Sequence, residues 1–140
     1  YRIHRTAYMQ LRKIAIEKLV RYYYAPISWV EIIGKVYREA NKLNINISKL
    51  IDAASDSIFK SGFYEYIQPS EKAIKLAFKL RAVGHKDIID NLLYAIAITN
   101  DMIFLTMDEK FKRFLSEHKY DIKNLMDHTQ LINLVRGKGR

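Results

Sequence analysis

Two aspartates, Asp90 and Asp108, enclose the almost wholly apolar stretch DNLLYAIAITNDMIFLTMD, and a third carboxylate, Glu31, stands far upstream of them. Carboxylate oxygens are hard ligands that suit Mg²⁺ or Mn²⁺, and the chain contains no cysteine that would favour a softer metal. A divalent ion held by carboxylates can activate water and neutralise charge that develops on a phosphate group. If the three side chains meet in the fold, these residue types predict metal-assisted hydrolysis of a phosphodiester.

The elements between the two aspartates are predicted to bring them side by side. We expect a helix over residues 87–99, a turn at Asn100 and Asp101, and a strand over 102–106. About 12 residues of helix and about five of strand span roughly 18 Å and roughly 17 Å, so the returning strand matches the helix in length. Asp90 and Asp108 are therefore expected to finish close together.

The helix over residues 87–99 is predicted to be buried, because it is apolar on all sides and has no polar stripe. The apolar residues on the faces of this helix are Ile88, Ile89, Leu92, Leu93, Ala95, Ile96, Ala97 and Ile98.

The rest of the chain reads as helices that alternate with short strands. Such alternation predicts an α/β fold, a three-layer sandwich with a central parallel sheet. Glu31 lies in the first turn after a predicted strand, so it is expected at the sheet edge where parallel strands end and ligands usually bind. The remaining helices are expected over 4–20, from Ser28 to Leu43, from a cap at Ser48 to Gly62, from a cap at Ser70 to Gly84, and over 110–117; the remaining strands are expected over 22–25, over 63–67 and near Leu125.

Each carboxylate also has a purely structural explanation. The segments 28–31 and 106–109 have the spacing of a capping box, Asp87 can cap the helix that Asp90 enters, and acidic residues favour the first turn of helices. The three carboxylates together favour a metal, because like charges within about 4 to 6 Å repel unless a cation lies between them. Thr106 and Asn91 can position a water or a carboxylate, although both are also ordinary turn and capping residues.

The composition predicts a single soluble domain, residues 1–140, with a polyanionic partner. Twenty-four Lys and Arg residues against fifteen Asp and Glu give a net charge of +9, with a last basic cluster at Arg136, Lys138 and Arg140. An acidic protein partner is the alternative. The absence of cysteine fits a reducing cytoplasm, and no apolar stretch reaches the roughly 20 residues that span a bilayer.

The aromatic residues allow two interpretations. The chain has ten tyrosines and one tryptophan, and Tyr22, Tyr23, Tyr24 and Trp29 lie close together in the sequence. Such a group either stacks on bases of single-stranded RNA or packs a core and a dimer face.

At the acidic residues the sequence resembles the PIN-domain ribonucleases, in particular the VapC-like toxins of toxin–antitoxin pairs. The segment from Asp90 to Ala97, with Leu105 to Asp108 and Phe111, is similar to the third and fourth acidic positions of that family, and residues 25–31 are similar to its second acidic motif. The likeness covers roughly residues 22–115. It implies a metal-dependent endoribonuclease with Glu31, Asp90 and Asp108 as ligands, and such proteins are often dimeric and often inhibited by an antitoxin.

The sequence departs from this family at its start. The first acidic residue of the family ends an amino-terminal strand, and nothing before the helix predicted over 4–20 matches that strand. Either the strand and its acid precede Tyr1, or the site lacks one ligand. The second case predicts a catalytically degenerate PIN-like module that binds RNA or protein, and a ribosomal-RNA maturation nuclease is a further alternative to a toxin.

Overall fold

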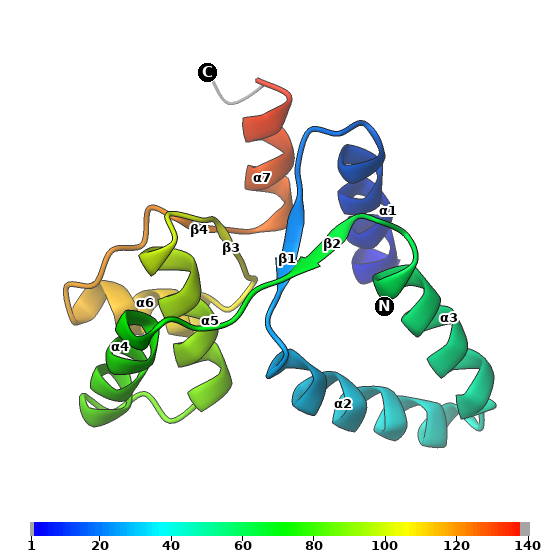
Figure 1. Ribbon diagram of the computed structural model, residues 1–140, viewed down its shortest axis with the longest axis horizontal. Helices are drawn as coiled ribbons and strands as arrows, with labels where there is room; N and C mark the ends of the chain where they lie inside the picture. Colours follow the sequence, from blue (N-terminus) through cyan, green and yellow to red (C-terminus); the bar gives the residue numbers. More distant parts are fainter. Residues whose placement is uncertain (1, 138–140) are drawn as a thin grey trace. The chain divides into compact units, whose positions relative to one another are not determined.

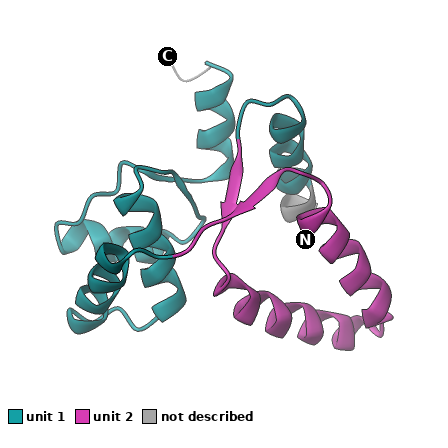
Figure 2. Ribbon diagram, viewed as in Figure 1, with its two compact units in different colours: residues 1–20, 69–140 teal, residues 21–68 magenta. Residues whose placement is uncertain are grey.

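The computed structural model describes residues 2–137 of the chain, with side chains from Thr6 onward (Figure 1). Lys138 and Arg140, which the sequence groups with Arg136 in a basic cluster, lie outside the described residues. The chain forms two compact units, residues 21–68 and residues 1–20 with 69–140 (Figure 2). Each unit combines helices with one pair of parallel strands, in agreement with the predicted α/β class.

The unit of residues 21–68 consists of a parallel strand pair joined by two helices (Figure 1). Its elements are β1 (Tyr22–Tyr24), α2 (Ser28–Leu43), α3 (Ile47–Phe59) and β2 (Tyr64–Tyr66).

Aromatic side chains pack on one another in this unit. Tyr22 and Tyr64 are register partners on β1 and β2, and their ring centroids lie 5.8 Å apart. Trp29 stacks on Phe59 with centroids 5.7 Å apart. This packing favours the structural interpretation of the Tyr22 and Trp29 side chains over base stacking.

The unit of residues 1–20 and 69–140 holds the remaining elements, including the strand pair of β3 and β4. In chain order these are α1 (Arg2–Ile16), α4 (Glu71–Ala82), α5 (Ile88–Thr99), β3 (Phe104–Leu105), α6 (Glu109–Glu117), β4 (Leu125–Met126) and α7 (His128–Val135).

The core of this unit is contributed by α4, α5, α6 and β4, and α4 and α5 lie alongside each other (Figure 1). Ser70 Oγ accepts from Ala73 N at 3.1 Å and caps α4, as predicted. Gly84, with φ +118°, follows this helix, and the backbone N–H of His85 then donates to Leu80 O at 3.1 Å. The buried side chains at the centre of the core are Leu80, Tyr94, Phe111, Leu115 and Leu125.

Two predictions about the stretch between the aspartates are corrected. α5 is not buried on all sides: Tyr94 and Ala95 are buried, whereas Ile88 is 65% exposed. The strand expected over 102–106 is reduced to the two residues of β3. Met102 N instead donates to Ala97 O at 2.9 Å, so this residue still belongs to the turn after α5.

One expected helix cap and two possible capping boxes are also corrected. Asn46, not Ser48, caps α3, since its side chain accepts from Ser48 N at 3.0 Å. α2 begins after Ile27 without a side-chain cap, so Ser28 does not form a capping box with Glu31. The cap of α6 is Asp108 itself and not Thr106.

The strands of the described residues pair as two separate two-stranded parallel sheets, β1 with β2 and β3 with β4. The single central sheet of a three-layer sandwich therefore stays a prediction. The helices that the structure describes include none with both the length and the apolar character of a membrane span.

Candidate active site

Asp90 lies in the first turn of α5, at a helix start that the sequence predicted correctly. Asp87 caps the helix, and its Oδ1 accepts from the backbone N–H of Asp90 at 3.1 Å. The side chain of Asp90 follows within the same turn and is half-buried. The local fold therefore fixes the backbone of Asp90 through the neighbouring carboxylate of Asp87.

Asp108 has a structural role as the cap of α6. Its Oδ1 accepts from Phe111 N at 3.0 Å, and this bond caps α6. Thr106 Oγ1 accepts from the backbone N–H of Asp108 at 3.2 Å. Thr106 therefore fixes the turn that presents Asp108, whose side chain is exposed at the end of β3.

His85 joins the starts of α5 and α6. Its Nδ1 lies 2.6 Å from Asn91 Oδ1, and Asn91 Nδ2 donates to His85 O at 2.9 Å. An amide oxygen only accepts, so Nδ1 of His85 carries the proton in this bond. On its other side, the His85 ring stacks on Phe111 of α6, with centroids 4.4 Å apart.

These contacts run without interruption from the first turn of α5 to the cap of α6. Asn91 follows Asp90 directly, and Phe111 is the residue whose N–H binds the Asp108 carboxylate. The two helix starts that carry Asp90 and Asp108 are thus tied to a single side chain, His85. No sequence pattern signalled this role, because a histidine six residues before an asparagine has no recognised spacing.

Asn91 is a structural residue. Its side chain is fully buried and its amide makes both hydrogen bonds to His85, so it is not available to position a water or a substrate. Among the side chains that the structure describes, Asn91 is the one polar residue that is buried. Its amide replaces the water contacts that burial removes, since a buried amide without partners would be costly.

Glu31 belongs to the unit of residues 21–68. It lies in the first turn of α2 and forms an ion pair with Lys35, one turn further along, with Oε1 and Nζ 2.6 Å apart. Its side chain is 38% exposed. The convergence of Glu31 with Asp90 and Asp108 stays a prediction. Among the side chains that the structure describes, no group of three acidic or histidine residues is arranged to hold a metal ion.

Sequence reasoning missed Asp127, a further carboxylate near the end of β3. The strands β3 and β4 are parallel, with Leu105 opposite Met126, so Thr106 and Asp127 follow their strands at the same edge. Asp127 caps α7, and its Oδ1 accepts from Gln130 N at 2.8 Å in a complete capping box. An aspartate shortly after each of the last two predicted strands, Asp108 and Asp127, was the signal that could have singled it out.

A comparison with protein families gives one match. The family model of the PIN domain matches residues 4–115 of the chain. No curated protein and no solved structure matches the chain. The matched range contains Glu31, Asp90, Thr106 and Asp108, and it includes the helix starts that His85 joins.

Proposed function

The chain belongs to the PIN-domain family, whose members are typically nucleases that use divalent metals, and from this premise we propose that it is a metal-dependent endoribonuclease. The observation that carries the proposal is the link through His85, which ties the helix starts of Asp90 and Asp108 together. Hydrolysis of a phosphodiester on a divalent ion requires acidic groups that meet at one place, and we propose that Asp90 and Asp108 do so.

The donor atoms of Glu31, Asp90 and Asp108 fit Mg²⁺ or Mn²⁺, which prefer hard oxygen ligands. When bound, such an ion would activate water and neutralise charge on the phosphate. The chain's own residues orient the carboxylates: Asp87 fixes the backbone of Asp90, and Thr106 fixes that of Asp108. The meeting of Glu31 with the two aspartates is part of the proposal.

We place the enzyme among the VapC-like toxins, with RNA as substrate, an antitoxin as inhibitor and a homodimer as the working form. The proposal includes a cytoplasmic location and a single PIN-like domain over residues 1–140, built as a three-layer sandwich around one parallel sheet. The net charge of +9 supports a polyanionic substrate. A ribosomal-RNA maturation nuclease would use the same groups on another RNA.

One observation favours a second function, that of a catalytically degenerate PIN-like module which binds RNA or protein. Glu31 is paired with Lys35, one turn further along the same helix, which engages the carboxylate in an ion pair. Such a module would bind RNA without cutting it.

A metal-titrated cleavage assay on total RNA separates the two functions. We expect cleavage that depends on Mg²⁺ or Mn²⁺ and that falls at least about 100-fold in Asp108→Asn, because Asn keeps the cap of α6 but loses the charge. Asp101→Asn is the matched control: Asp101 is exposed, and its positive φ of 53° suits Asn equally well.

Cleavage at the parent rate by Asp108→Asn, or equal losses in Asp108→Asn and Asp101→Asn, would refute the assigned role of Asp108. RNA binding without any cleavage across the metal titration would establish the degenerate module instead.

A further inference from the structure

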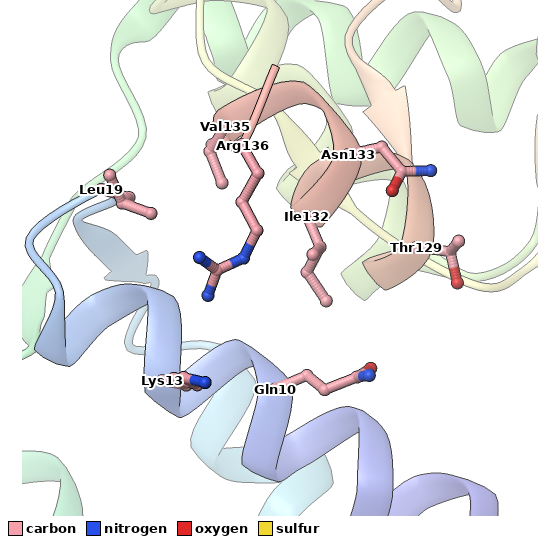
Figure 3. Close-up of a pocket in the computed structure, with 8 residues that line it drawn as sticks. All are labelled: Gln10, Lys13, Leu19, Thr129, Ile132, Asn133, Val135 and Arg136. Atoms are coloured by element: carbon pink, nitrogen blue, oxygen red, sulfur yellow. The ribbon is translucent and has the colours of Figure 1, made fainter. Parts of the chain in front are cut away.

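A groove lies between α1 and α7, and none of the residues assigned to the chemistry lines it (Figure 3). Its volume is about 830 Å³, within the roughly 300 to 1,000 Å³ of typical ligand pockets. α1 ends at Ile16, and Lys18 then takes a positive φ of 60° while Leu19 N donates to Ile14 O at 2.9 Å. This turn folds Leu19 over the end of α1, so that its side chain lines the groove.

Two cations face the groove from opposite helices. Lys13 comes from α1 and Arg136 from the end of α7, and Figure 3 shows the guanidinium group of Arg136 directed across the gap toward α1. The side chains of Gln10 and Asn133 also line the groove and can both donate and accept hydrogen bonds. None of the lining residues is acidic. The lining therefore favours a ligand that carries negative charge and hydrogen-bonding groups.

The groove also has an apolar part. Leu19, Ile132 and Val135 line it beside the polar residues, and Ile132 and Val135 come from α7. A free phosphate or a highly charged small anion would leave these side chains without contacts. A nucleotide matches both parts, because its phosphate is anionic and its base presents a flat face together with polar edges.

Arg136 is already oriented by an ion pair within the unit. Its Nη2 lies 2.7 Å from Glu17 Oε2, across the gap between α7 and α1. A guanidinium group has five N–H donors, so one bond to Glu17 leaves others for a phosphate. The pair also reduces the side-chain entropy that binding would cost.

We propose that the groove between α1 and α7 is an RNA-binding site, which holds one nucleotide of a single strand with its phosphate on Lys13 and Arg136. A single strand is required because the bases of a duplex are stacked and paired, and cannot face Leu19, Ile132 and Val135. The inference rests on the proposed ribonuclease function and adds to it an anchor for the substrate outside the acidic residues.

The test measures binding of the full chain to a fluorescent, unstructured oligoribonucleotide in EDTA, where metal-dependent cleavage is suppressed. Lys13→Gln and Arg136→Gln are each expected to weaken binding by about fivefold to tenfold and to lower the salt slope of log K by about 0.7. Arg12→Gln is the matched control. Arg12 precedes Lys13 on α1 but does not line the groove, because successive residues of a helix point about 100° apart.

Glu17→Gln separates phosphate binding from a structural role of the ion pair. Both Glu17→Gln and Arg136→Gln break the pair, but only the first leaves the cation in place and removes a carboxylate beside it. RNA affinity is therefore expected to rise or stay unchanged in Glu17→Gln and to fall in Arg136→Gln. Equal losses in the two variants would overturn the proposal.

The proposal is also overturned if Lys13→Gln and Arg136→Gln bind RNA like Arg12→Gln while their thermal unfolding matches the parent. Its failure is distinct from that of the ribonuclease function. If the chain cleaves RNA but binds it without the groove, only the groove proposal is refuted. If the chain binds RNA through the groove and never cleaves it, only the ribonuclease function is refuted.

Discussion

Tyr94 shows at the scale of a single residue how burial makes stability depend on pH. Its side chain is 1% exposed, and its hydroxyl donates to Asp121 O at 2.6 Å. Burial, and then the neighbouring Asp121 and Tyr120, raise the pKa of Tyr94 from 10 to about 12. The folded chain therefore keeps this proton at a pH where the unfolded chain has lost it.

The raised pKa predicts a loss of stability in alkaline solution. The contribution of the neutral Tyr94 hydroxyl is complete below pH 10 and is lost as the pH rises through 12, and between pH 9 and pH 11 it falls by about 1 kcal/mol. Tyr94→Phe should be about 1 kcal/mol less stable than the parent at pH 7, because the Asp121 carbonyl loses its donor, and should lose less stability above pH 10.

Urea unfolding at pH 7, 9 and 11 measures both effects. Burial and the neighbouring Tyr64 also raise the pKa of Tyr22 to about 12, and this titration is common to both proteins and cancels in their difference. Equal losses of stability in parent and variant between pH 9 and pH 11 would show that Tyr94 does not titrate as stated.

At the scale of elements, the order of helices and strands was predictable because local patterns specify it. Capping residues and glycines mark the start of α4 and α5 and the end of α4, and Ser70 and Asp87 cap the helices as expected. The cap of α3 was misplaced by two residues, because Asn46 and Ser48 are both good caps and the sequence does not choose between them. Strand length and sheet partners depend on distant segments, so the reduction of the strand over 102–106 to two residues had no local signal.

The contact between the starts of α5 and α6 was the part of the site that could not be predicted from the sequence. The positions of Asp90 and Asp108 at helix starts follow from the sequence, but the contacts between the two starts come from the side chain of His85, in the turn after α4, and from Tyr94, which packs on Phe111. The contact is made by tertiary packing of three helices, and neither periodicity nor spacing encodes it.

This link predicts that Asn91 is more important for stability than an ordinary asparagine. Asn91→Ala should lower the free energy of unfolding by about 2 to 3 kcal/mol, because Nδ1 and the carbonyl of His85 both lose their partner. Asn41→Ala removes the same atoms from an exposed position on α2 and should change the free energy of unfolding by less than about 0.5 kcal/mol. Urea unfolding compares the two variants, and similar small losses in both would exclude a structural role for the His85 link.

At the scale of the whole molecule, the proposed function assigns different roles to the net charge and to the acidic groups. The net charge of +9 attracts a polyanion over the surface, and the carboxylates of Asp90 and Asp108 are proposed to act on it at one place. The family supports nuclease chemistry at this level, since the PIN-domain match covers residues 4–115. Whether Asp90 and Asp108 serve one site is therefore the claim on which the proposed function depends.

A double-mutant cycle on the rate of RNA cleavage tests that claim most directly. Asp90→Asn, Asp108→Asn and the double variant are compared with the parent in saturating Mn²⁺, with thermal unfolding as the check on folding. If both carboxylates hold one ion, each single change lowers the rate at least about 100-fold and the double variant falls no further than about threefold below the singles. Parent-like cleavage by both single variants, or losses that multiply to about 10⁴ in the double variant, would contradict a shared site.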